Sequence, residues 1–233
     1  MLNNLWLIKR EQRKKSEKIL PFSMNRKKNH RMVKLPRDPI TKNIALDILA
    51  TLADISPTHA ISRFSHHRNQ IIILLLYLFG LRINELGHFY YNNWKQLIEL
   101  GNTKIYQPKT NEYRELFLTE RNKKLMIKTN KILPEVFRLN HVCLLTDAKG
   151  KKLDEKHVIK TINKILKPFS DKYNCNIKSH SFRIGLVTGL FQKNVPSLII
   201  QEIIGHKDLA STLRYNRHKA TKVEKLQALS KLS

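Results

Sequence analysis

The chain has 233 residues, and its 44 lysines and arginines against 18 aspartates and glutamates give a formal net charge of +26. Internal ion pairs cannot neutralise such an excess, which favours a polyanionic partner. The basic residues are spread along the chain, so nucleic acid fits better than a membrane surface. The longest apolar run, IIILLLYLFGL, is shorter than the about 20 residues that span a bilayer and predicts a buried helix.

The N-terminal part differs in composition from the rest. Residues 1–34 carry eleven lysines and arginines against two glutamates, which predicts a basic arm. Such an arm is either a solvated tail or a segment that follows a DNA strand. No cleavage signal follows the first apolar residues, so we expect an intracellular, DNA-associated protein. Cys143 and Cys175 form no C-x-x-C pair and indicate neither a disulfide framework nor a zinc ribbon.

The folded domain is expected to begin near Leu35, where two prolines precede an apolar pattern of helical spacing over 44–52. A polar loop around 56–67 and an apolar helix over 68–79 follow, and Gly80 ends that helix. A second short helix is expected over 83–90. Next, TKIYQ and YRELFL alternate in character around PKTNE, which predicts a β-hairpin with Lys109 at or beside its turn.

The rest of the chain shows helical patterns and signals for helix ends. Helices are expected over 120–132, 155–168, 180–193, 196–204 and 208–216, with an amphipathic piece over 219–231. The candidate N-caps are Thr119, Asp154 and Ser179, while Pro196 suits a first helical turn and Gly205 a helix end. The predicted fold class is therefore mainly α with a small antiparallel β-sheet, an α+β domain.

Two short segments hold residues that suit phosphate chemistry. In SHSFRIG, His180 and Arg183 are three residues apart on a predicted helix, so their side chains share one face. In FGLRINELG, Arg82 follows the buried helix directly, and Glu85 stands three residues on, where it can orient the guanidinium. An arginine this close to a core needs a partner or a ligand. Taken singly, both pairs also suit an ordinary protein surface.

Together the candidates form an ordered set: Arg82, Lys109, His180, Arg183, His206 and Tyr215. Their order and spacing resemble the catalytic domain of the tyrosine recombinases, the phage integrase family, over residues 36–218. The stretch HSFRIGLVTGLFQKNVPSLIIQEIIGHKDLASTLRY is similar to the second conserved box of that family, and GLRINEL to the first. Ile184 stands where the family often has a histidine.

The resemblance implies a site-specific DNA recombinase that cleaves and rejoins strands through a 3′-phosphotyrosyl intermediate. Tyr215 would be the nucleophile, which needs activation because a phenol normally ionises near ~10. Negative charge builds on the non-bridging oxygens of the phosphate, and Arg82 and Arg183 are expected to hold them with charge-assisted bonds. His180 and the arginines would activate the tyrosine.

Two further roles complete the expected site. His206 would donate a hydrogen bond to the phosphate and stabilise its developing charge. Lys109 would protonate the leaving sugar oxygen, with Lys104 as a nearby alternative. Because protein cations already surround the phosphate, neither a metal nor a cofactor is expected, and strand exchange requires no ATP.

The resemblance also implies an organisation and partners. We expect a basic arm over 1–34, a catalytic domain over 35–218 and a C-terminal helix over 219–233, which either docks on a neighbouring subunit or packs on its own domain. Double-stranded DNA is the expected substrate, bound by four copies of the chain on two sites, with no membrane partner. Members of the family usually carry a helical domain of their own before the catalytic domain, where this chain has the short arm.

Other readings stay open at this point. A non-catalytic or truncated DNA-binding relative would keep the fold without needing Tyr215, and a type IB topoisomerase would use similar residues to relax supercoils. An RNA-binding or ribosomal protein explains the charge and leaves the ordered set unexplained. Zinc binding by Cys175, His180 and His206 is disfavoured, because their spacings match no common ligand pattern.

Overall fold

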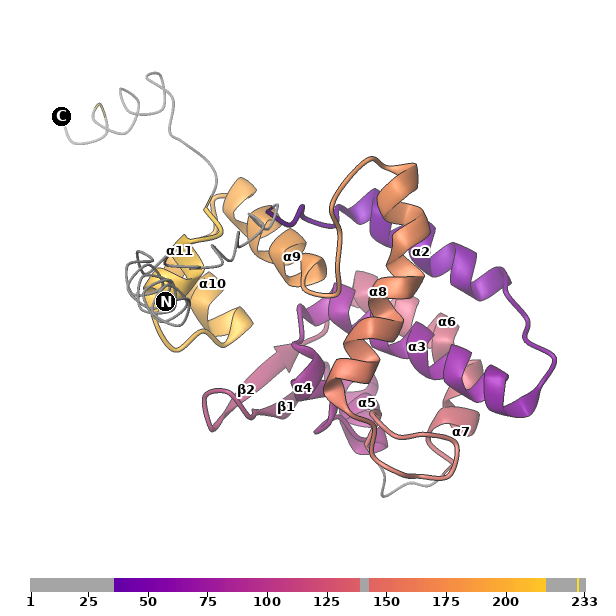
Figure 1. The fold of residues 1–233 in the computed structure, drawn as a ribbon. Helices are drawn as coiled ribbons and strands as arrows, with labels where there is room; N and C mark the ends of the chain where they lie inside the picture. The colour runs from indigo at the N-terminus through magenta and orange to yellow at the C-terminus, as the bar shows by residue number, and fades with distance from the viewer. Residues whose placement is uncertain (1–35, 139–142, 217–229, 231–233) are drawn as a thin grey trace, which may run out of the picture. The chain divides into compact units, whose positions relative to one another are not determined.

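The computed structural model describes residues 36–138, 143–216 and 230, all of which belong to one compact unit beginning at Pro36. The expected arm over 1–34 lies outside the described residues, as does the helix expected over 219–231 apart from Ser230. The described part is mainly helical and contains a two-stranded antiparallel sheet (Figure 1). The predicted fold class is therefore confirmed.

Helix α3 (Ala60–Phe79) forms the centre of this unit, and α2 (Lys42–Asp54) packs along it. Every side chain from Ile71 to Leu76 is at most 3% exposed, because this run is apolar on all sides of the helix. Helix α2 turns Ile44, Ile48 and Leu52 toward it, as their spacing predicts. No helix in the described ranges is long and apolar enough to cross a membrane.

The expected polar loop over 56–67 is wrong from residue 60 onward, because α3 begins at Ala60 instead of residue 68. Phe64 is buried in this added part. The polar residues beside it find partners on other segments: Nε2 of His66 lies 2.8 Å from the carbonyl oxygen of Leu52, and Nδ1 of His67 lies 2.7 Å from the carboxylate of Glu135. Tertiary partners thus stabilise a turn of helix that polarity alone disfavours.

Gly80 ends α3 in the left-handed region, with φ of 57°, as its position predicts. The short helix α4 (Ile83–Leu86) follows and covers only the first half of the expected 83–90. A further helix, α5 (Tyr91–Leu100), was not expected from the sequence. It buries Trp94 and Leu97, and the indole nitrogen of Trp94 donates a 3.1 Å bond to Asn130.

The predicted β-hairpin is confirmed. Strand β1 (Asn102–Gln107) pairs antiparallel with β2 (Glu112–Phe117), and Asn111 takes a positive φ of 58° in the turn between them. Lys109 lies in this turn and is exposed. Alternation along the strands sends one set of side chains into the protein, namely Ile105, Gln107, Arg114 and Leu116.

Helix α6 (Glu120–Thr129), the 3₁₀ turn η1 (Asn130–Ile132) and α7 (Leu133–Val136) follow the hairpin. Helix α8 (Glu155–Lys172) then packs against α2 and α4. It continues through Pro168, past its expected end, because Phe169 beyond the proline is still buried. Thr119 and Asp154 are N-caps as predicted, each accepting a bond from a backbone N–H of the first turn.

The C-terminal helices are α9 (Ser181–Gln192), α10 (Ser197–Ile204) and α11 (Leu209–Leu213). The predicted N-cap at Ser179 is wrong: His180 occupies that position, and the N–H of Ser179 donates to the side chain of Asn163. Gly205 ends α10 in the left-handed region, as predicted. Helix α11 ends earlier than expected, so Tyr215 lies in the turn beyond it.

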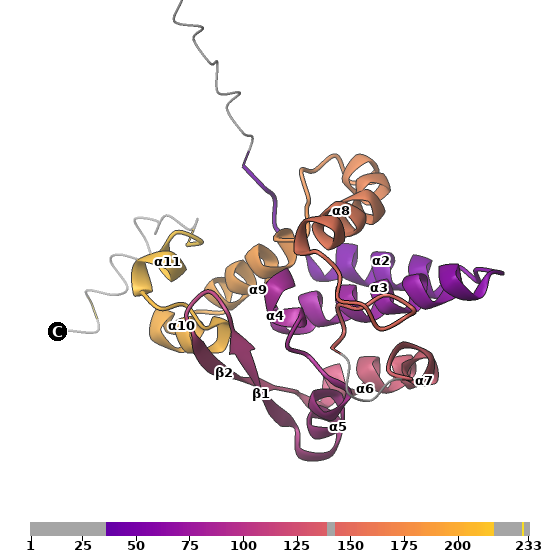
Figure 2. The same cartoon turned by 60° about the horizontal axis from the view of Figure 1, so that its bottom comes forward.

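Two apolar clusters result. The larger one surrounds α3, and the smaller one consists of Val187, Ile200 and Ile204 with partly buried neighbours that include Tyr215. Helix α9 joins the two, because it packs against both α3 and α10. The two views show the β1–β2 hairpin beside α10 and on the side of the molecule away from α6 and α7 (Figures 1 and 2).

Candidate active site

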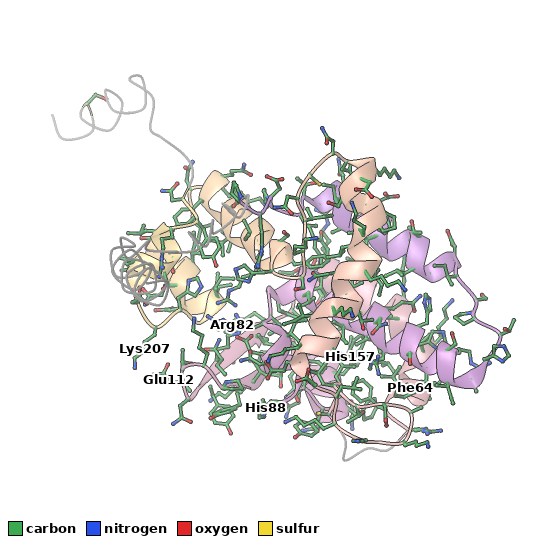
Figure 3. The ribbon with its side chains drawn as sticks, in the orientation of Figure 1. Phe64, Arg82, His88, Glu112, His157 and Lys207 are labelled. Atoms are coloured by element: carbon green, nitrogen blue, oxygen red, sulfur yellow. The ribbon has the colours of Figure 1, made fainter. Side chains whose placement is uncertain are left out.

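Arg82 stands where the chain leaves the central helix. Gly80 reverses the backbone, and Arg82 then takes an extended conformation immediately before α4. Its guanidinium Nη1 donates a 2.7 Å bond to Oε1 of Glu85, and its backbone N–H donates a 3.1 Å bond to Oε2. The predicted orientation of Arg82 by Glu85 is thus what the structure shows. Figure 3 labels Arg82 beside α4, on the side of the molecule toward α10 and α11.

Glu85 is fully buried and accepts from three residues at once. Besides Arg82, it receives Nη2 of Arg114 at 3.2 Å and Nε2 of Gln107 at 3.1 Å. A buried carboxylate is costly unless cations and hydrogen bonds compensate it, and here both kinds of partner are present. Burial lowers the pKa of Arg114 to about 10, and the negative charge of Glu85 opposes that shift.

Arg183 is 1% exposed and links two segments that are distant in sequence. Its Nη1 donates a 2.9 Å bond to the carbonyl of Gly80, and its Nη2 donates a 2.9 Å bond to the carbonyl of Ile204. Its Nε finds no hydrogen-bond partner among the described residues. Burial, followed by the charges of Arg82 and Arg114, lowers its pKa to about 9. The guanidinium therefore remains charged at neutral pH and is held rigidly.

His180 and Tyr215 meet directly. Nε2 of His180 lies 2.9 Å from the hydroxyl oxygen of Tyr215. Burial is the largest cause that lowers the pKa of His180, to about 4, and the charges of Arg183, Arg37, Arg82 and Lys109 act in the same direction. The imidazole is neutral near pH 7 and can accept the phenol proton at Nε2, which is the geometry that general-base activation needs.

His206 packs against the ring of the same tyrosine. Its ring stacks on that of Tyr215, with centroids 5.7 Å apart and an angle of 13° between the planes. Its Nδ1 lies 2.9 Å from the hydroxyl oxygen of Thr212, which is fully buried and fixes the ring from α11. Burial and the charges of Arg183 and Arg82 lower the pKa of His206 to about 3. A neutral ring keeps one N–H that can donate to an anion.

The two candidate lysines lie in different surroundings. Lys109 is near enough to the site for its charge to contribute to the lowered pKa of His180. Lys104 instead lines a polar pocket of ≈ 410 Å³ on the other side of the hairpin, together with Asn93 and Gln96. The structure therefore brings Lys109 toward the other five candidates and places Lys104 elsewhere. Beside the site, a pocket of ≈ 350 Å³ is lined by residues that include Arg37, Arg82, Lys178 and His180.

The sequence-based expectation missed Arg114 and Gln107. Arg114 is 5% exposed and donates to the carbonyl oxygens of Phe79, Ile203 and Ile204 as well as to Glu85. The strand pattern in the sequence could have indicated that both are buried. Alternation in YRELFL puts Arg114 on the same face as the apolar Leu116, and alternation in TKIYQ puts Gln107 on the same face as Ile105. Read in this way, the pattern predicts a buried cation that needs an acidic partner.

The structure does not bring Cys175, His180 and His206 into an arrangement that could bind zinc. Among the described residues, no three histidine, cysteine, aspartate or glutamate side chains are placed to hold a metal ion. His180 and His206 both face Tyr215, whereas Cys175 packs against the larger apolar cluster. Arg82, Arg114 and Arg183 outnumber the nearby carboxylates of Glu85 and Asp208, so the charge around Tyr215 is positive and suits an anion.

A known protein family and several known relatives match most of this chain. The model of the phage integrase family matches residues 41–222. Tyrosine recombinase XerA of Pyrococcus furiosus is 26% identical over 206 residues, which cover 85% of this chain and 66% of that protein. A probable integrase/recombinase protein of Methanocaldococcus jannaschii is 27% identical over 71% of this chain and 50% of its own length.

Solved structures share the fold. XerH recombinase bound to its difH substrate before cleavage aligns with a TM-score of 0.65 at 22% identity, over 88% of this chain and 57% of that one. A crystal structure of XerA recombinase aligns with a TM-score of 0.58 at 16% identity, over 84% and 66%. The chain thus spans about half to two thirds of the length of these curated relatives and solved chains. The chain belongs to the phage integrase family.

Proposed function

We propose that this chain is a site-specific DNA recombinase that cuts and rejoins DNA strands through a covalent link on Tyr215. The observation that carries the proposal is the 2.9 Å contact between the Tyr215 hydroxyl and Nε2 of a neutral His180. A phenol beside a base, inside a cluster of fixed cations, is prepared to attack a phosphodiester. The formal charge of +26 supplies the attraction to DNA.

The reaction begins with attack on the scissile phosphate. The oxygen of Tyr215 forms a bond to phosphorus, and His180 accepts the phenol proton at Nε2. Negative charge gathers on the non-bridging oxygens, where Arg82, Arg183 and the N–H of His206 stabilise it. Because buried bonds to Glu85 and to backbone carbonyls already hold the two guanidinium groups, little reorganisation is needed at the moment of reaction.

The second half of the step releases the sugar. The bond from phosphorus to the 5′-oxygen breaks, and Lys109 gives that oxygen a proton, which leaves a 3′-phosphotyrosyl link and a free 5′-hydroxyl. A 5′-hydroxyl from a partner strand then attacks the link, and the proton movements reverse. The bond energy stays in the tyrosyl ester, so the exchange requires no ATP.

The proposal extends to organisation and partners. Residues 35–218 form the catalytic domain, and the basic residues of 1–34 add positive charge that attracts the DNA backbone. Double-stranded DNA is the substrate, and four copies of the chain on two sites carry out an exchange. The relatives named above support the assignment of DNA as substrate: one of the similar structures is a recombinase bound to difH DNA.

The test is covalent capture. Nicked duplexes from the regions flanking the gene, chosen around inverted repeats with a short spacer, are incubated with the protein and separated in detergent. We expect a protein–DNA adduct with the wild type and none with Tyr215→Phe, which keeps the ring and removes the nucleophile. If both proteins bind the duplexes equally and neither forms an adduct on any of them, the chain is a DNA-binding relative without strand-transfer activity. Relaxation of supercoiled DNA without a preferred site would indicate a type IB topoisomerase.

A further inference from the structure

The side chain of Gln107 occupies a buried position at the base of the β1–β2 turn. It is 2% exposed. Its Nε2 lies 3.1 Å from Oε1 of Glu85 and 3.4 Å from the carbonyl oxygen of Gly205. A carboxylate and a carbonyl oxygen can only accept, so the amide nitrogen must face both of them, and the orientation of this amide follows from its partners.

This one amide joins three segments of the candidate site. The Glu85 oxygen that it contacts is the same atom that receives Nη1 of Arg82. Gly205 directly precedes His206, the residue stacked on Tyr215. The fit is close, because a Cβ atom built on Gly205 would lie 2.4 Å from Oε1 of Gln107. The hairpin is therefore tied, beside its turn, both to α4 and to the turn after α10.

The same residue also closes the turn that carries Lys109. The carbonyl oxygen of Gln107 accepts the backbone N–H of Thr110 at 3.1 Å and that of Asn111 at 2.9 Å. Lys109 itself is exposed at the tip, two residues beyond the last buried side chain of β1. A long, flexible side chain at an exposed tip delivers a proton reproducibly only when the base of its turn is fixed.

We propose that Gln107 is a positioning residue for Lys109: its amide fixes the base of the turn against Glu85 and Gly205, so that the lysine ammonium reaches the leaving 5′-oxygen. This inference rests on the proposed recombinase function. It assigns Gln107 to one half of the reaction, the protonation of the leaving group, and gives it no part in the attack by Tyr215.

The two halves can be separated with a modified substrate. A duplex with sulfur in place of the bridging 5′-oxygen at the scissile phosphate releases a thiolate, which leaves without receiving a proton. The Tyr215–phosphorus bond still forms, the phosphorus–sulfur bond breaks, and His180 still accepts the phenol proton. A defect confined to proton delivery therefore disappears on this substrate, whereas a defect in attack or in phosphate binding persists.

The variant of choice is Gln107→Met, which keeps the side-chain length and removes both hydrogen bonds. On the oxygen substrate we expect Gln107→Met to slow adduct formation about 10-fold or more. Lys109→Ala should slow it by ~10²-fold, because a general acid contributes a factor of that size. On the sulfur substrate both variants should return to within about 3-fold of the wild type. The double variant should be no slower than Lys109→Ala alone, because the two residues then act in one step.

Gln96→Leu is the matched control, because Gln96 is a glutamine on α5 that accepts a bond from Thr103, at the end of β1 away from the turn. It should react like the wild type on both substrates. Equal slowing of Gln107→Met on the two substrates, or no slowing at all, would overturn the proposal. Should Gln107→Met fail to fold in thermal melts, Gln107→Asn gives the same comparison, since it stays neutral and its shorter amide no longer reaches Glu85 and Gly205. Absence of any adduct with the wild type would instead refute the recombinase function itself.

Discussion

Arg114 and Arg183 donate to the same carbonyl oxygen, that of Ile204, from two different elements: one lies on β2 and the other on α9. Both are almost fully buried, and each also binds the end of α3, at Phe79 and Gly80 respectively. The last carbonyls of two helices are thus satisfied by two cations, which complement the negative ends of the helix dipoles. This cross-link, rather than a continuous apolar core, fixes α10 beside the hairpin.

Arg114→Met should therefore destabilise the protein strongly. The change leaves the carbonyls of Ile203 and Ile204 and one oxygen of Glu85 short of a donor, and breaking a buried ion pair costs about 3 kcal/mol. Urea unfolding measures the effect. Arg121→Met, on an exposed position of α6, removes the same charge and should cost less than about 0.5 kcal/mol. Similar losses in the two variants would contradict a structural role for Arg114.

His180→Gln should slow adduct formation about 10²-fold or more, because the phenol of Tyr215 loses the base that accepts its proton. Hydroxide from solution must then remove that proton, so the rate of the variant should rise with pH more steeply than that of the wild type. Single-turnover rates over a range of pH values test this, and binding to the same duplex serves as the control. A variant with parallel pH dependence would exclude His180 as the base.

The buried histidines predict a loss of stability in acid. The pKa of His180 is about 4 in the folded protein, against about 6.5 for an unfolded histidine. Below pH ~6.5 this histidine binds a proton in the unfolded chain and stays neutral in the folded protein. The free energy of unfolding is therefore highest above pH ~6.5 and falls toward pH ~4, by up to about 1.4 kcal/mol per pH unit. His206 acts in the same direction, because its pKa is also lowered. Urea unfolding from pH ~7 to ~5 should show a smaller decline for His180→Gln than for the wild type; equal declines would contradict the assignment.

Two glycines of α9 should respond oppositely to the same substitution. A Cβ atom on Gly185 would lie 2.1 Å from the backbone oxygen of Ile40, whereas one on Gly189 meets nothing within 4 Å. Gly185→Ala must push α9 away from the segment before α2 and should cost about 2–3 kcal/mol. Gly189→Ala should stabilise the helix by about 0.5–1 kcal/mol. Thermal melts of the pair decide the matter, and a destabilised Gly189→Ala would show that α9 is constrained in some other way.

The sequence predicted elements best where one residue type settles the local structure. Apolar residues on all sides of 71–76 indicate a central helix, and Gly80 and Gly205 supply the left-handed ends that other residues adopt only with strain. The sequence did not predict α5 or the first turns of α3, because contacts with residues far along the chain stabilise them. Trp94 donates a hydrogen bond to Asn130, and His67 contacts the carboxylate of Glu135. No local window contains those partners.

The candidate site was predictable in its members more than in its arrangement. Five residues were grouped into one site because their order resembles that of the family, and the structure places all five within one region: Arg82, His180, Arg183, His206 and Tyr215. Their secondary contacts were not predictable. That Tyr215 lies beyond the end of α11, and that Gln107 links the hairpin to Glu85, depend on how four separate segments pack.

Tyr215 packs against the small apolar cluster of Val187, Ile200 and Ile204 and not against the main core. A region with few buried contacts opens locally at a lower free energy than the whole domain unfolds. Opening of α10 and α11 would carry Tyr215 and His206 away from His180 while α2, α3 and α8 remain folded. Such an opening would also break the bonds of Arg114 and Arg183 to the carbonyl oxygen of Ile204, so these two cations and the apolar cluster together set the free energy at which Tyr215 leaves His180.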